Sequence, residues 1–178
     1  MHMKRSKRTQ LFLAIGSTLL MVLFAQFVLG HYSACFHVEG SLNSLGLSFG
    51  YSSEDVQIFV EARSSTQLNC YLNFLRIWDS LFPILYTLMY VLWIIYLFKR
   101  NTFLLIIPLL HMVTDWIENF FEITMIEQYM QTGIPEETLI SAGSVVTMLK
   151  WGLSVVTYAV LLYGIVKKLN IVQTTVKR

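Results

Sequence analysis

The chain has 178 residues and a formal net charge of +2, with 55% apolar residues and only 13% charged residues. A soluble domain carries about 25% charged residues, so this chain has too few charges to cover a surface in water. The composition excludes a soluble domain and predicts an integral membrane protein that contacts the lipid bilayer. It also leaves no room for a nucleic-acid-binding surface or a Cys/His zinc framework.

Four stretches are apolar and long enough to form transmembrane helices, each of which needs about 20 residues. They are residues 11–30, 78–98, 102–126 and 142–166. Since every backbone group in lipid needs a partner within the protein, these stretches must be helical. The sequence thus predicts an all-α fold, an integral membrane four-helix bundle. Residues 1–10 and 167–178 are its tails, and residues 31–77 and 127–141 are its outer loops.

The first stretch has an alternative interpretation, as a cleaved signal peptide with a basic start. Its uncharged apolar core runs from Leu11 to Leu29. That core is longer than the roughly 7–15 apolar residues of a signal peptide. We therefore expect it to remain as a membrane anchor.

Basic residues are distributed unequally between the two sides of the predicted bundle. Ten of the 13 Lys and Arg residues fall in the two tails and in the link between the second and third spans, where no acidic residue occurs. The positive-inside rule places such segments in the cytoplasm, so both termini are expected there. The ten residues are Lys4, Arg5, Lys7, Arg8, Lys99, Arg100, Lys167, Lys168, Lys177 and Arg178.

The first outer loop contains both cysteines, Cys35 and Cys70. On the side of the membrane opposite the cytoplasm, an oxidising compartment permits a disulfide bond between them. Two free thiols are the alternative.

The same loop also carries a helix signal, so we expect it to be structured. Ser52 or Ser53 is suited to cap a helix, and acidic residues follow in its first turn. Apolar residues then repeat at helical spacing up to about Ser64, which predicts a short amphipathic helix along the outer interface. The Gly/Ser-rich segment from Gly40 to Gly50 is typical of a turn-rich connector.

Ionisable and polar side chains inside the spans are the most informative feature. On the third span, steps of three and four residues place them on one face of the helix. Asp115 lies about 20 Å along that helix from Thr102, too deep for its short side chain to reach the surface. Because a charge in hydrocarbon costs several kcal/mol, we expect these groups to face one another or a wet cavity. The predicted cluster contains Asp79, Tyr86, His111, Asp115, Glu118, Asn119, Glu122 and Lys150.

Four of these residues also have a simpler interpretation, whereas Asp115 is harder to explain in that way. Glu122 and Lys150 could extend to the headgroups, Asp79 could be interfacial, and His111 could be an ordinary core histidine. The cluster as a whole could either bind a ligand or only hold helices together. No second histidine lies in a span, so we assign no metal ion, and the tyrosines and tryptophans indicate no cofactor.

Lys150 bears on how the cluster tolerates its charge. Several carboxylates cannot all be ionised in one poorly solvated space without strong repulsion. Lys150 is the only cationic residue inside the third and fourth spans. We therefore expect it to point into the bundle and to pair with Glu118, Asp115 or Asp79, while at least one remaining acid keeps its proton.

Several short motifs together resemble a family of small bacterial four-span membrane proteins to which no activity is assigned. The motifs are GY (Gly50, Tyr51), DxxFPxxY (Asp79, Phe82, Pro83, Tyr86), a proline (Pro108) and DxxEN (Asp115, Glu118, Asn119). The resemblance implies a bacterial plasma membrane protein. Where relatives often carry a Gly-Arg pair before the second span, this chain has Arg63-Ser64-Ser65.

The overall arrangement is also similar to the emopamil-binding sterol isomerase type of four-helix membrane fold. Both have cytoplasmic termini, a long first outer loop, an acid near the start of the second span and a histidine in the third. That likeness implies a ligand pocket between the helices that opens to the bilayer.

Three functions are consistent with these features. The polar cluster could bind a small cation or the polar end of a lipid-like ligand. It could be the site of a small membrane enzyme that uses Asp115 and Glu118 as acid and base. It could also pair with a basic helix of a membrane protein partner, as a subunit without catalytic activity. A lipid-sized cavity lined by the acids would favour the first two, and acids that face lipid would favour the third.

Overall fold

The computed structural model describes residues 7–98 and 102–176, and these are entirely α-helices, short 3-10 and π turns, and loops. Four of the helices are long and apolar enough to cross a membrane: Lys7–Phe36, Ser65–Phe98, Phe103–Thr132 and Glu137–Asn170. Six of the ten basic residues used to predict orientation, Lys4, Arg5, Lys99, Arg100, Lys177 and Arg178, lie outside the described residues.

The long helices extend beyond the predicted spans because hydropathy marks only their apolar parts. The first consists of α1 (Lys7–Leu23), a π turn (Phe24–Leu29), α2 (Gly30–Ser33) and a 3-10 turn (Ala34–Phe36). The second consists of α4 (Ser65–Phe74), a π turn (Leu75–Asp79) and α5 (Ser80–Phe98). The third is a 3-10 turn (Thr102–Leu105) followed by α6 (Ile106–Thr132), and the fourth is α7 (Glu137–Val176).

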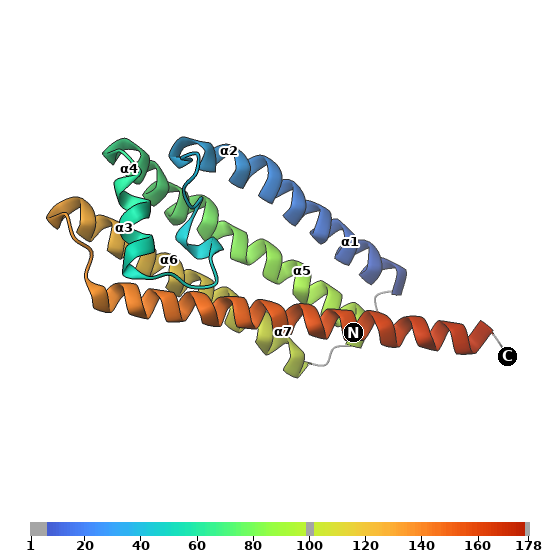
Figure 1. Cartoon of the computed structure of the whole chain (residues 1–178). Coiled ribbons are helices and arrows are strands. Elements are labelled where there is room, and N and C mark those ends of the chain that lie inside the picture. The colour runs from blue at the N-terminus through green and yellow to red at the C-terminus, as the bar shows by residue number, and fades with distance from the viewer. Residues whose placement is uncertain (1–6, 99–101, 177–178) are drawn as a thin grey trace, which may run out of the picture.

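The four long helices alternate in direction along one elongated bundle (Figure 1). We call the end where α1 begins and α7 ends the tail end. The other end, which we call the cap end, carries the short helix α3 (Ser53–Glu61), the start of α4 and the turn between α6 and α7. α6 packs along α7 and α5, whereas α1 packs along α5; among the described residues, no comparable contact joins α1 to α6 or α7.

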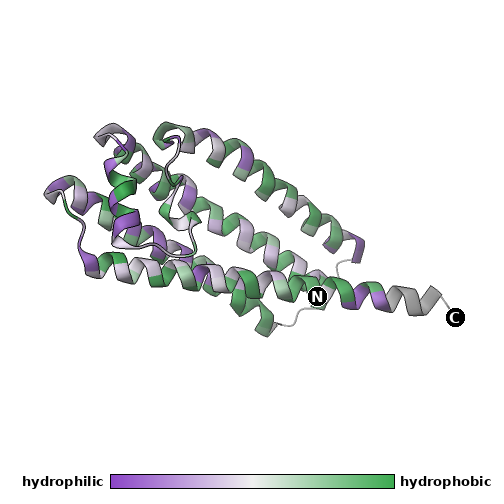
Figure 2. Ribbon diagram, in the orientation of Figure 1, coloured by the Kyte–Doolittle hydropathy of each residue, from purple (hydrophilic) through white to green (hydrophobic). Residues whose placement is uncertain are grey.

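Apolar residues predominate along the long helices, and hydrophilic residues are frequent at the cap end (Figure 2). Large exposed apolar residues are especially frequent on α1, where Phe12 and Phe27 are 74% and 71% exposed. Such a surface is stable only when lipid covers it. The described part of the chain therefore has the surface of a multi-pass membrane protein.

The buried apolar residues form two cores. The larger core lies at the cap end, where residues such as Phe59, Tyr71 and Met125 join the segment 36–75 to the end of α6 and the start of α7. The smaller core lies between α5 and α7 around Tyr90 and Ile94. The first loop is thus a packed structure that closes one end of the bundle.

Local hydrogen bonds define the cap. Ser52 and Asp55 form a reciprocal capping box at the start of α3, and Ser64 and Gln67 form a second one at the start of α4. The Ser52 backbone N–H, and next its side chain, donate to Asp55 and hold the pKa of that carboxyl below its usual value. Each box satisfies backbone N–H groups that a helix start leaves without partners.

Two further links tie the cap together. Cys35 and Cys70 are joined by a disulfide bond. Arg63 is buried, and its guanidinium donates hydrogen bonds to the carbonyl oxygens of Phe36 (2.9 Å), Leu42 (2.6 Å) and Phe59 (2.7 Å). Because this one side chain bonds three separate parts of the cap, Arg63 holds the loop against α3.

Candidate functional site

The structure divides the eight predicted polar residues into two groups. Five of them line a cavity of about 500 Å³ at the cap end, namely Asp79, Glu118, Asn119, Glu122 and Lys150. The other three, Tyr86, His111 and Asp115, are buried closer to the tail end and do not line that cavity.

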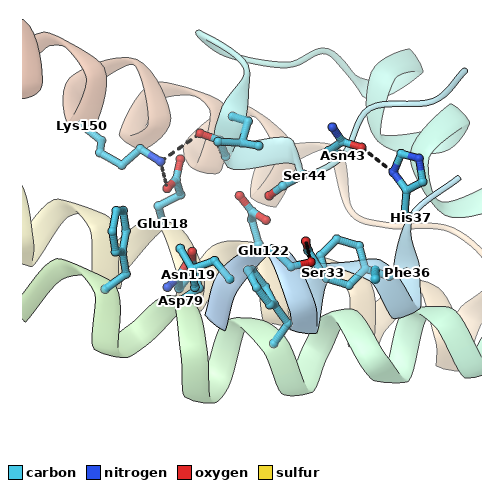
Figure 3. A pocket seen from close by; sticks show the side chains of 17 residues that line it. Ser33, Phe36, His37, Asn43, Ser44, Asp79, Glu118, Asn119, Glu122 and Lys150 are labelled. Carbon is cyan, nitrogen blue, oxygen red and sulfur yellow. Dashed lines mark hydrogen bonds and ion pairs between the residues drawn. The ribbon is translucent and has the colours of Figure 1, made fainter. Parts of the chain in front are cut away.

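All four long helices and one loop supply the cavity walls. α6 contributes Glu118, Asn119 and Glu122, which are 1%, 3% and 1% exposed. The apolar part of the wall consists of Leu29, Ala34, Phe36, Leu47, Phe74 and Phe82. Where α2 and the loop meet at the cavity, Gly30, His37, Asn43 and Leu47 are exposed, and a hydrogen bond of 2.8 Å joins the side chains of His37 and Asn43 (Figure 3). The volume of the cavity is within the range of about 300–1,000 Å³ that is typical of ligand sites.

Asp79 reaches the cavity through an irregularity in its helix. It is the last residue of the π turn Leu75–Asp79, and Pro83 follows four positions later within α5. Proline has no N–H, and its ring clashes with the carbonyl four residues before it, which here is that of Asp79. The motif D-x-x-F-P thus has a physical basis, because Pro83 perturbs the helix at the residue that bears the carboxylate.

Lys150 enters the cavity from α7 and does not extend to the surface. Its amine pairs with Glu118 Oε2 and also donates to the carbonyl oxygen of Gly46 at 2.9 Å (Figure 3). The Trp151 indole N–H donates to the same carbonyl at 3.2 Å. The pairing with Glu118 is one of the three that the sequence allowed, and the two bonds to Gly46 hold the loop over the carboxylates.

Gly46 is suited to this position because it has no side chain. A Cβ there would lie 2.8 Å from Glu122 Oε1 and 3.1 Å from Glu118 Oε2. Both carboxylates therefore approach the same point beneath the loop. The sequence predicted this segment only as a connector, and its Gly/Ser content gave no signal that it packs against buried acids.

Glu122 has one satisfied and one unsatisfied oxygen. Tyr71, which is fully buried, donates its hydroxyl proton to Glu122 Oε2. The Ser44 hydroxyl lies 2.9 Å from the Tyr71 oxygen, and it must be the donor there because the tyrosine has only one proton. Within the described part of the chain, Oε1 of Glu122 is buried without a hydrogen-bond partner, and so are Oε1 of Glu118 and Nδ2 of Asn119.

The cavity lies near one edge of the apolar part of the bundle. Lys150 is 17 residues before Lys167, which corresponds to about 26 Å of helix. The hydrocarbon core of a bilayer is about 30 Å thick. If the lysines at the tail end mark one boundary of that core, Lys150 lies inside the core, within about 4 Å of the other boundary and just below the lipid headgroups.

The deeper group is held together by aromatic contacts. The Tyr86 hydroxyl donates to Asp115 Oδ2 at 2.9 Å, and its ring stacks on that of His111 with centroids 4.6 Å apart. Tyr90 also faces the His111 ring, at 6.1 Å between centroids. Asp115 is thus engaged by Tyr86 and separated from the cavity that Glu118 lines.

Tyr51, from the GY motif, does not line the cavity, but it is buried near Glu122, and the polar-cluster prediction did not include it. Gly50 before it has a φ of +140°, a conformation that favours glycine, and Tyr51 then donates its backbone N–H to the Ser144 hydroxyl at 3.0 Å. Burial, and next the negative charge of Glu122, raise the pKa of the Tyr51 hydroxyl well above its usual value, so it stays protonated. The motif therefore anchors the loop to α7.

In the part of the chain that the structure describes, no group of three or more His, Cys, Asp or Glu side chains is arranged to hold a metal ion. Comparison with protein family models, with curated proteins and with solved structures finds no match to this chain. Its function must therefore be inferred from the cavity and its residues.

Proposed function

We propose that this protein binds the cationic end of a membrane-soluble amphiphile in the cavity at the cap end. The observation that carries this proposal is the composition of the cavity wall, which combines three carboxylates and one lysine with apolar side chains. The carboxylates suit a positively charged headgroup, and the apolar wall suits a hydrocarbon chain. Their position just below the headgroups matches the way such a molecule sits in a bilayer.

Charge supports a cation over an anion. Asp79, Glu118 and Glu122 carry three negative charges when ionised, and Lys150 offsets only one of them. A cation that enters the cavity relieves the mutual repulsion of the remaining acids. An anionic headgroup would add to it.

The direction of the acidic side chains favours a ligand over a partner helix. Glu118 and Glu122 are 1% exposed and face the inside of the bundle, where a basic helix from another protein does not reach them. The alternative of an enzyme that uses Asp115 and Glu118 as acid and base also has less support. Asp115 accepts a hydrogen bond from Tyr86 and does not line the cavity with Glu118.

We also propose that the cap end faces away from the cytoplasm, in the plasma membrane of a bacterium. The excess of Lys and Arg in the tails and the disulfide in the cap both support this orientation. The resemblance to small bacterial four-span membrane proteins agrees with this location, and the likeness to the emopamil-binding type of fold agrees with a pocket between helices that opens to lipid.

Binding of dodecylamine to the purified protein in lipid nanodiscs tests the proposed function. At neutral pH this probe is a cation with a hydrocarbon chain, whereas dodecanol is neutral and dodecanoate is an anion. We expect saturable binding of dodecylamine and much weaker binding of the other two. Equal binding of all three probes, or no saturable binding of dodecylamine, would contradict the proposal.

Two variants assign the binding to the cavity. Glu122→Gln removes a buried carboxylate from its wall, and we expect it to weaken dodecylamine binding about tenfold or more, the value of a lost charge-assisted hydrogen bond. Glu127→Gln is the matched control, because Glu127 is on the same helix but is exposed and pairs with Arg76 outside the cavity. It should bind like the wild type.

A further inference from the structure

The unpartnered atoms in the cavity wall indicate the chemistry of the ligand in more detail. Four polar groups matter: the carboxylates of Glu118 and Glu122, the amide of Asn119 and the carboxylate of Asp79. Buried polar atoms in proteins almost always have hydrogen-bond partners. The unpartnered ones among these groups therefore define which donors and acceptors a bound molecule must supply.

Glu118 and Glu122 need a donor with a positive charge. Lys150 donates to Oε2 of Glu118, and Tyr71 donates to Oε2 of Glu122. The other oxygen of each carboxylate, Oε1, is buried without a partner among the described residues. Near Gly46, the free Oε1 of Glu122 lies close to the Glu118 carboxylate, whose Oε2 is the oxygen that Lys150 engages. An ammonium group carries three N–H donors, so one such group beside the two carboxylates has enough donors for both free oxygens.

The Asn119 amide needs an acceptor, and the Asp79 carboxylate beside it can take a further donor. Nδ2 of Asn119 is an unpartnered buried donor, and the Asp79 carboxylate lies beside it in the same wall (Figure 3). A hydroxyl group accepts one hydrogen bond and donates another. It can therefore accept from the Asn119 amide and donate to Asp79.

The two subsites are close together, because their residues line one cavity of about 500 Å³ and because Glu118 and Asn119 are four and three residues before Glu122, on one face of α6. The ammonium and the hydroxyl must then be close together in the ligand. On the basis of the proposed function, we propose that the ligand is a long-chain amino alcohol, with the amine and the hydroxyl on neighbouring carbons. Its ammonium lies between Glu118 and Glu122, and its hydroxyl lies against Asn119 and Asp79.

A phospholipid headgroup does not fit these subsites. A phosphate is negatively charged, as are the ionised carboxylates in the wall, so they repel it. The single lysine in the wall is already paired with Glu118. The hydrocarbon chain of an amino alcohol is accommodated by the apolar wall, which includes Phe36, Phe74 and Phe82.

Competition between related probes in nanodiscs tests the inference. The probes are dodecylamine, 2-aminododecan-1-ol and the methyl ether of that amino alcohol, which can accept a hydrogen bond but cannot donate one. We expect the amino alcohol to bind about fivefold or more tightly than dodecylamine, as one net neutral hydrogen bond provides. The methyl ether keeps the bond from Asn119 and loses the one to Asp79, so it should bind less tightly than the amino alcohol.

A variant of the hydroxyl subsite gives a second test. Asn119→Leu should bind dodecylamine about as well as the wild type does and should lose the preference for the amino alcohol. The comparison of the three probes on the wild-type protein decides the inference even if this variant does not fold. Equal affinity for dodecylamine and the amino alcohol would overturn the inference and leave the proposed function standing, whereas failure of every amine to bind would overturn both.

Discussion

At the scale of single residues, two glycines let polar side chains approach the backbone of a neighbouring element. Gly46 allows Glu118 and Glu122 to reach the loop, and Gly143 on α7 allows the Tyr51 hydroxyl to lie directly against the helix. Neither glycine has a positive φ. Their role is to leave space, and a sequence alone does not distinguish such a glycine from one in a turn.

Gly143→Ala should destabilise the protein. The new methyl group would overlap the Tyr51 hydroxyl and would also lie 3.3 Å from Phe121 Cβ. Overpacking of this kind costs about 1–3 kcal/mol, and we expect that loss in the free energy of unfolding measured in mixed micelles. Gly152→Ala is the control on the same helix, because its new methyl group would meet no atom of another described element within 4 Å. A Gly143→Ala variant as stable as Gly152→Ala would show that Tyr51 does not pack as described.

The pairing of Lys150 with Glu118 leads to a second prediction. The side chains are 12% and 1% exposed, so Lys150→Met leaves a carboxylate without its partner in a buried place. Removal of one partner from a buried pair typically costs about 3–5 kcal/mol. Lys150→Met should therefore be strongly destabilised, and the double variant Lys150→Met/Glu118→Gln should regain part of that loss.

The exposed pair Arg76–Glu127 provides the control for this double-mutant comparison of Lys150 and Glu118. Its side chains are 44% and 45% exposed, and exposed pairs contribute about 0–1 kcal/mol. Arg76→Met and the double variant Arg76→Met/Glu127→Gln should both unfold close to the wild-type midpoint. A Lys150 cycle with no coupling between the two positions would contradict the pairing.

At the scale of elements, the sequence predicted the helices well and their irregular parts poorly. Apolar runs and the Ser52 cap identified the four long helices and α3, because periodicity and capping are local properties. The two π turns, Phe24–Leu29 and Leu75–Asp79, were not predicted. They contact each other at the wall of the cavity, and such tertiary contacts have no signature within one helix.

The capping box of α3 gives a prediction that depends on pH. Asp55→Ala removes the hydrogen bonds that Ser52 donates at the helix start, and the loss of a cap costs about 1 kcal/mol. Because the folded-state pKa of Asp55 is lowered, its contribution is complete above the usual value of 3.8 and is lost as the pH falls below it. The stability difference from the wild type should therefore shrink in acid. Glu54→Ala, which removes an acid from the same turn without a capping bond, should show a smaller difference at every pH.

At the scale of the whole molecule, the polar cluster was predicted as one site and the structure divides it. Steps of three and four residues predicted that His111, Asp115, Glu118 and Glu122 share one face of a helix. In the structure all four are buried on α6. The sequence could not show that the loop around Gly46 meets only the part of that face nearest the cap end. It also could not show that Tyr86, stacked on His111, binds Asp115 away from the cavity. The partition depends on contacts between residues that are about 100 positions apart, and these follow from the packing of the loop against α7.

The same loop, through its disulfide, allows the orientation of the bundle to be measured. Cys35 and Cys70 lie at the cap end, and Thr9 lies at the tail end, near the start of α1. If the cap faces away from the cytoplasm, a membrane-impermeant reductant followed by a membrane-impermeant maleimide should label both cysteines in intact cells. In the variant Cys35→Ser/Cys70→Ser/Thr9→Cys, the single thiol should be labelled only after the cells are permeabilised. The reverse pattern would place the basic tails outside, against the positive-inside rule, and would move the cavity and its proposed amphiphile to the cytoplasmic leaflet.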